Sequence, residues 1–172
     1  VPDGSLMRAE SGEVVSPVLS YEDIEQLQEI VRAIRHAGAR ADASCGIHIH
    51  VDGARFDAKS VANLAKMVHK QERLLEHALQ VSATRLSRYC KSIDAGFMAR
   101  LTNSRPRTNE ELSQAWYGAP GVRPRRYDDS RYRGLNLNSF FYRGTIEFRY
   151  YAESSVMRSS ERAWPRSSVM AP

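Results

Sequence analysis

Ser-Cys-Gly-Ile-His-Ile-His-Val-Asp, residues 44–52, alternates apolar and polar side chains as a β-strand with two different faces does. One face is apolar and typical of a strand that packs on a core: Ile47, Ile49 and Val51. On the other face His48, His50 and Asp52 place potential metal-ligand atoms side by side. A half-exposed strand can also carry two histidines without a chemical role, so the other strands must decide between these interpretations.

The composition is that of a globular protein. The chain has 172 residues, 42% hydrophobic and 26% charged, enough to bury a core in one domain. No apolar run is long enough to span a bilayer and no signal peptide opens the chain, so we expect a cytoplasmic protein. We expect Cys45 and Cys90 to be thiols.

The charge balance indicates an anionic ligand. The net charge is +5, and Arg, whose planar fork suits phosphate and carboxylate, far outnumbers Lys. No basic helix or aromatic-lined module for single strands stands out, which argues against nucleic acid. A compositional bias of the coding sequence would give the same balance.

The first third of the chain predicts a strand and a helix. Residues 13–17, Glu-Val-Val-Ser-Pro, indicate a short strand that ends at proline. Ser20 is a good N-cap, an apolar periodicity follows over residues 24–34, and Gly38 supplies a stop. Because this helix leads directly into the His-x-His strand, we expect it to pack on the sheet.

Three segments follow. Asp57 caps a second predicted helix that runs to about Val81. Residues 84–133 are rich in Arg and Pro, with one short helix near 109–116, and indicate either a mobile basic flap or a floppy insertion. Residues 132–151 alternate again on both sides of a turn at Arg143 and Gly144, which predicts a β-hairpin.

The predicted strands share one polar face. Its members come from separate stretches of the chain: Glu13, His48, His50, Asn136, Glu147 and Arg149. If these strands form one curved antiparallel sheet, two acids, two imidazoles and a guanidinium meet at a concave site. Carboxylates with imidazoles suit Mg²⁺ or Mn²⁺ beside a phosphate, and Arg149 could brace that phosphate.

The chain resembles the putative amidoligases of the carboxylate-amine ligase superfamily, which includes glutamine synthetase and glutamate-cysteine ligase. Four ordered motifs carry the resemblance over about residues 3–151: Gly12 to Pro17, Cys45 to Asp52, Arg133 to Asn136, and Gly144 to Arg149. The resemblance implies an α+β fold in which an antiparallel sheet curls into a glutamine-synthetase-like half-barrel with helices on its outer face.

The resemblance also implies a reaction, in which ATP phosphorylates a carboxylate and an amine then displaces phosphate to form an amide. Glu13, His48 and Glu147 would bind Mg²⁺. His50 would lie by the nucleotide phosphates and Arg149 would stabilise the transferring phosphoryl group. The remaining pair would contact substrate or phosphate: Arg133 and Asn136. The substrates would be a small-molecule or peptide carboxylate and an amine.

The expected organisation is a catalytic domain over residues 1–151 and a poorly ordered serine-rich tail over 152–172. Family members normally begin with a strand that carries a Glu-x-Glu pair of further metal ligands, and we expect this domain to lack it. Without these two carboxylates we expect weaker metal binding or slower turnover. Two alternatives remain open. One is a metal-dependent hydrolase, because His-x-His on a strand also begins hydrolase metal sites. The other is a degenerate nucleotide-binding domain without catalysis.

Overall fold

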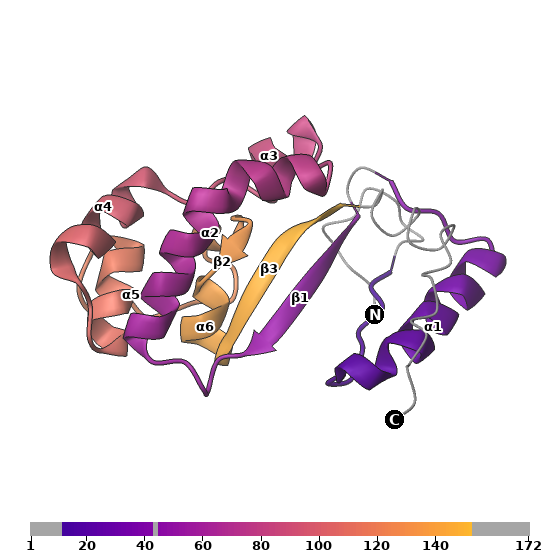
Figure 1. Ribbon diagram of the computed structural model, residues 1–172, viewed down its shortest axis with the longest axis horizontal. Coiled ribbons are helices and arrows are strands. Elements are labelled where there is room, and N and C mark those ends of the chain that lie inside the picture. Colours follow the sequence, from indigo (N-terminus) through magenta and orange to yellow (C-terminus); the bar gives the residue numbers. More distant parts are fainter. Residues whose placement is uncertain (1–11, 43–44, 153–172) are drawn as a thin grey trace, which may run out of the picture. The chain divides into compact units, whose positions relative to one another are not determined.

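The computed structural model describes residues 12–42 and 45–152. They belong to two compact units, one that ends at Cys45 and one over Gly46–Ala152. Each unit is described by itself (Figure 1). Among the described residues there are six α-helices and a small antiparallel sheet, so the expected α+β class is confirmed.

The first unit contains the predicted helix. Ser20 and Asp23 form a capping box, in which the Ser20 N–H donates to Asp23 Oδ2 at 2.6 Å. A 3₁₀ turn, η1 (Tyr21–Asp23), leads into α1 (Ile24–His36). The chain leaves the helix through Gly38, which has φ +95°, a conformation that glycine adopts without strain. The predicted helix and both of its end signals are confirmed.

The prediction of a strand over residues 13–17 is wrong. This stretch forms no strand, and Val14 and Val15 are 67% and 66% exposed. Two valines favour extended backbone, but a strand needs a neighbour with which to exchange hydrogen bonds, and Pro17 has no N–H to offer. Local propensity alone therefore did not produce a strand.

The sheet of the second unit has three strands in the order β1-β3-β2: β1 (Gly46–Asp52), β3 (Thr145–Ala152) and β2 (Leu135–Asn136). Both pairings are antiparallel, and β3 is central. Within the described residues the sheet is neither curled nor closed, so the expected half-barrel is not seen there.

The apolar face of β1 differs from the prediction. Ile47, Ile49 and Val51 are 38–39% exposed, although the alternation predicted a core face. Because β1 is an edge strand of the unit, the core forms under β3 instead, where Ile146 and Tyr150 are 1% and 2% exposed. Alternation gives the two faces of a strand correctly but does not say what covers them.

The helix α2 (Ala58–Ala78) confirms the prediction for residues 57–81. The Asp57 carboxylate accepts the Ser60 N–H at 2.7 Å and caps the helix. Val61 and Ala65 are fully buried in one core with β3 residues. Figure 1 shows α2 running beside the sheet, with α4 and α5 beyond it.

Residues 84–133 form short helices instead of the predicted flap or insertion: α3 (Ala83–Arg88), α4 (Ala95–Ser104), α5 (Asn109–Tyr117) and the 3₁₀ turn η2 (Asp129–Arg131). The expected helix near 109–116 is α5. Each α-helix begins at a side-chain cap, provided by Ser82, Asp94 and Thr108. Phe97 of α4 and Leu112 of α5 are buried in the core. This tertiary packing explains why helices this short are stable.

The predicted hairpin over 132–151 is partly correct. β2 and β3 pair as expected, with Leu135 opposite Phe148 and Asn136 opposite Glu147. Their connection is a helix, α6 (Asn138–Arg143), instead of a longer strand and a turn. Gly144, with φ +76°, ends that helix.

A buried hydrogen-bonded carboxylate links α2 to the central strand. Glu72, 4% exposed, accepts the Tyr150 hydroxyl at 2.7 Å and the Ile93 N–H at 3.0 Å. These bonds fix β3, the loop before α4 and α2 relative to one another. A buried carboxylate needs such partners because burial penalises its charged form.

No disulfide joins Cys45 and Cys90, as predicted. Among the described residues no helix is long and apolar enough to cross a membrane. The predicted serine-rich tail, apart from Ala152 at the end of β3, lies outside the described residues.

Gly134→Ala should destabilise the second unit. A Cβ at this position would lie 2.1 Å from Cε1 of the buried Tyr150 ring, so we expect the unfolding free energy to fall by about 1–3 kcal/mol. Urea unfolding followed by circular dichroism measures this loss. Gly96→Ala is the control, because its Cβ would approach mainly side-chain ends of Arg100 and Asp94. Equal stability of both variants would contradict the tight packing of Tyr150.

Burial raises the pKa of Glu72 above its ordinary 4.5, although the Tyr150 and Ile93 hydrogen bonds lower it in part. The folded state therefore keeps a proton at a pH where the unfolded chain has lost it, and stability falls as pH rises through this window. Glu72→Gln cannot ionise. We expect wild type to lose more unfolding free energy than this variant between pH 4 and pH 8, as measured by urea unfolding. Parallel pH profiles would contradict the raised pKa.

Candidate functional site

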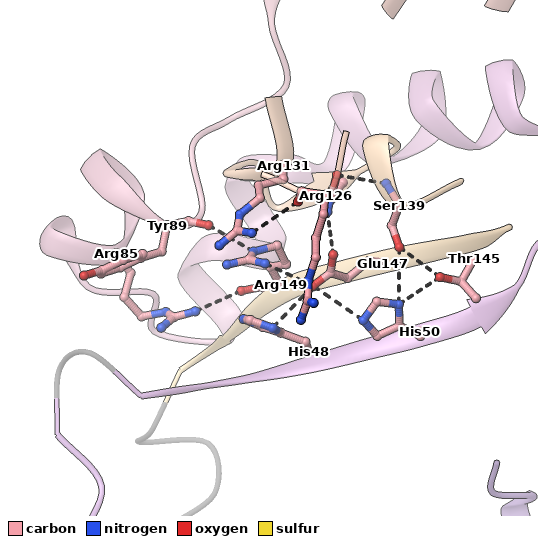
Figure 2. Close-up of polar contacts among 11 residues, drawn as sticks. His48, His50, Arg85, Tyr89, Arg126, Arg131, Ser139, Thr145, Glu147 and Arg149 are labelled. Atoms are coloured by element: carbon pink, nitrogen blue, oxygen red, sulfur yellow. Dashed lines mark hydrogen bonds and ion pairs between the residues drawn. The ribbon is translucent and has the colours of Figure 1, made fainter. Parts of the chain in front are cut away.

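The Glu147 carboxylate is the centre of the polar face. Glu147 lies on the central strand and is 4% exposed. Its Oε1 accepts Arg149 Nη1 at 3.1 Å and lies 3.3 Å from His48 Nδ1 and 3.7 Å from His50 Nε2. Figure 2 shows the two imidazoles and the guanidinium turned toward this oxygen. The structure thus brings together four of the predicted site residues.

A fifth predicted residue, Asn136, binds the second carboxylate oxygen. Its side-chain amide donates to Glu147 Oε2, and its Oδ1 accepts the Ser139 N–H at 3.3 Å. Asn136 is 3% exposed. In this arrangement it orients Glu147, while its expected contact with substrate or phosphate stays a prediction.

The register explains why these side chains meet. His50 and Asn136 both lie opposite Glu147, one on each neighbouring strand. Cross-strand neighbours on one face have side chains within contact distance. Between the pairs Ile47–Tyr151 and Ile49–Phe148 the register shifts. Such a bulge re-aims side chains locally, and here it lies beside His48 and Arg149.

Arg149 is fixed by groups that the motifs did not reveal. Its Nε donates to the Tyr89 carbonyl at 3.2 Å, and its own carbonyl accepts Arg85 Nη2 at 3.3 Å. Arg85, on α3, is 2% exposed. Its guanidinium occupies the space beside Gly46, where a Cβ would lie 2.4 Å from Nη2. Because glycine has no side chain, the Arg85 guanidinium can pack against the strand at this position.

His50 is oriented by two hydroxyl groups. Its Nδ1 lies 2.9 Å from Thr145 Oγ1 and 3.4 Å from Ser139 Oγ, and the two hydroxyls are 2.9 Å apart. These contacts leave Nε2 turned toward Glu147 (Figure 2). Thr145 lies on β3 two residues before Glu147, so alternation places both side chains on one face. Ser139 and Arg85 lie outside any strand, and no local signal marked them.

The site favours an uncharged His48. Burial and the neighbouring Arg149 cation lower the pKa of His48 to about 4, against an opposing effect of Glu147. At neutral pH the ring is therefore neutral. Because the folded pKa is below the ordinary 6.5, the folded state binds fewer protons and this contribution to stability is lost as pH falls from 6.5 toward 4.

The charges of the site suit an anion. Two buried guanidinium groups lie at the site, because Arg149 contacts Glu147 and Arg85 donates to the Arg149 carbonyl. Guanidinium forks bind phosphate and carboxylate through charge-assisted hydrogen bonds.

The expected metal ligands are only partly assembled. His48 and Glu147 are adjacent, but no group of three or more His, Cys, Asp or Glu side chains within residues 12–42 and 45–152 could hold a metal ion. Glu13 lies in the first unit and is described separately, so its role as a ligand stays a prediction. The two donors that do meet, the Glu147 carboxylate and the neutral His48 imidazole, are of types that suit Mg²⁺ or Mn²⁺.

Arg133 contacts another part of the unit. Its Nη1 donates to the Ser92 carbonyl at 2.6 Å, and its Nη2 lies 3.5 Å from Asp94 Oδ2. The structure therefore gives Arg133 partners outside the Glu147 cluster. Asp52 also takes no part, because its Oδ1 accepts the Ala54 N–H at 3.0 Å in the turn after β1.

In this α+β unit a buried Glu–Arg pair on the central strand meets two histidines of the neighbouring strand, an arrangement typical of an enzyme active site. A comparison with protein families identifies the kind of enzyme. The model described as "Putative amidoligase enzyme" matches residues 5–164. The chain belongs to this family, as the motifs predicted. Searches of curated proteins and of solved structures found no match.

The pKa of His48 offers a test of this geometry. An NMR titration of the ring resonances should place the His48 pKa near 4, and Arg149→Gln should raise it because the cation with the largest electrostatic effect on the ring is removed. Arg73→Gln, an exposed substitution on α2, is the control and should leave the titration unchanged. A His48 that titrates near 6.5 in wild type would show that the ring is neither desolvated nor close to Arg149.

Proposed function

We propose that this protein is an ATP- and Mg²⁺-dependent ligase that joins a carboxylate to an amine. In the first step a carboxylate oxygen attacks the γ-phosphorus of ATP, which gives an acyl phosphate and releases ADP. In the second step the amine nitrogen attacks the acyl carbon, phosphate leaves, and the nitrogen loses a proton as the amide forms. Membership of the family supports the reaction class.

The observation that carries the proposal is the buried pair of Arg149 and Glu147 on the central strand, with Nη1 and Oε1 3.1 Å apart. Phosphoryl transfer depends on positioning and on groups that neutralise the charge of the phosphoryl oxygens. Arg149 is fixed in advance by Glu147 and the Tyr89 carbonyl, so little reorganisation is needed when the charge develops. We assign to Arg149 the stabilisation of the transferring phosphoryl group.

The other side chains support that role. His48 and Glu147, with Glu13 as the expected further ligand, would hold Mg²⁺, which supplies positive charge to the phosphates when bound. His50, oriented by Thr145, would donate from Nε2 to a phosphate oxygen. Asn136 keeps Glu147 in place, and Arg133 is proposed to contact the substrate.

The curled half-barrel of the superfamily remains part of this proposal. β1 lies at the edge of the three-stranded sheet, so a further strand could pair there and extend the polar face. Small molecules or peptides with a carboxylate and an amine are the proposed substrates.

The proposal predicts that phosphate release requires three partners. Wild-type protein mixed with ATP and Mg²⁺ should release phosphate only when a carboxylate and an amine from a panel of amino acids and short peptides are both present. Arg149→Lys should lower the turnover at least about a hundredfold, because a single ammonium cannot replace the oriented fork. Malachite-green detection of phosphate and mass spectrometry of the amide measure both effects.

Arg73→Gln is the matched control and should keep the wild-type rate, since it changes one exposed arginine outside the cluster. Phosphate release that ignores the amine would contradict ligation. Zinc or iron found by elemental analysis, with hydrolysis and no ATP use, would instead indicate the metallohydrolase. ATP binding without turnover on any substrate would indicate the domain without catalysis.

A further inference from the structure

A second concave surface lies in the Gly46–Ala152 unit. It is a groove of about 520 Å³ between the first turns of α2 and the segment that joins α4 to α5. The polar residues that line it are Asp57, Lys59, Asn63, Lys66, Arg105 and Arg107. We call it the basic groove. It shares no residue with the Glu147 cluster.

Its walls come from two elements that are distant in the sequence. Lys59, Asn63 and Lys66 follow one another at spacings of four and three on α2, so they lie along one face of that helix. Arg105 and Arg107 flank the buried Pro106 in the segment opposite. The fixed φ of proline limits the conformations of this short connection between the arginines.

The positive charges of the groove are poorly compensated. Among the described residues, none of the four cationic side chains forms an ion pair within 4 Å or a side-chain hydrogen bond. Asp57 is the acid of the lining. It interacts electrostatically with Lys59, and its carboxylate also caps α2 through the Ser60 N–H. Glu111 acts on Arg107 electrostatically, but its Oε2 accepts the backbone N–H groups of Arg107 and Thr108.

The backbone of Arg105 adds an independent observation. Arg105 has φ +46° and ψ +62° at the C-cap of α4, a left-handed conformation that glycine usually occupies. A side chain there costs roughly 1–2 kcal/mol. A strained arginine that lines a groove is a reason to look for a ligand at its guanidinium.

We propose that the basic groove binds a condensed phosphate with two or more negative charges, either an inorganic polyphosphate or the phosphate chain of a nucleotide. Two guanidinium forks and two ammonium groups match the several oxygens of such a chain, and arginine binds phosphate oxygens in pairs. Clustered positive charges in a concave surface also raise the local concentration of an anion. This binding requires neither ligase activity nor Mg²⁺.

Calorimetry with sodium tripolyphosphate, without divalent metal and at low salt, tests the groove. Lys66→Gln combined with Arg105→Gln should weaken binding at least about tenfold, because each lost cation removes a charge-assisted hydrogen bond. Lys70→Gln combined with Arg73→Gln is the matched control. It removes the same charge from the exposed part of α2 outside the groove and should leave the affinity unchanged.

Three results would overturn the proposal: no binding by wild type, equal weakening in both double variants, or no weakening in the groove variant. Thermal unfolding by circular dichroism must show that both double variants fold. If the groove variant does not fold, Arg107→Gln takes its place. A parallel titration with ADP identifies the source of the phosphate. Weakening of both probes in the groove variant supports a nucleotide, and weakening of tripolyphosphate alone supports an inorganic ligand.

Discussion

The buried Glu147 carboxylate is the constraint on which the candidate site depends. Burial of an ionised carboxylate is strongly unfavourable unless other groups compensate its charge and bind its oxygens. Here Arg149 supplies the charge, His48 lies against Oε1, and Asn136 donates to Oε2. Removal of one partner from a buried pair costs about 3–5 kcal/mol. All three strands of the unit must therefore keep their register for Glu147 to remain buried.

The same constraint prepares the site for chemistry. The two faces of the central strand have different roles. On the core face Tyr150 donates to Glu72, and on the opposite face Glu147 lies against the histidines. The contacts on the core face thus hold the strand in place. The Arg149 side chain is already held by the Tyr89 carbonyl, so it loses little conformational freedom when an anion binds. A neutral His48 keeps a lone pair available for a metal ion or a proton. Stability and proposed function thus depend on the same contacts.

The abundant arginines have distinct roles in the structure. Composition alone indicated only an anionic ligand for them. Arg85 and Arg149 are buried beside the site, and Arg100 donates to the Ala115 carbonyl at 2.7 Å and so joins α4 to α5. Arg105 and Arg107 line the basic groove instead. The region that resembled a flap folds because capped short helices bury apolar side chains such as Phe97. Its sequence shows these caps, but their significance depends on a core that local reasoning cannot see.

The sequence by itself determined the elements with strong local signals and the polar side of each strand. α1 and α2 have readable caps and periodicity, and alternation correctly placed His48, His50 and Glu147 on one face. Only the tertiary structure decided which groups meet that face. Asn136 reaches Glu147 through register, and Arg85 comes from α3 to lie against Gly46. Two predictions were wrong for the same reason: the strand at residues 13–17 and the burial of the apolar face of β1. Alternation fixes the direction of a side chain, whereas pairing and burial require a partner that lies far away in the sequence.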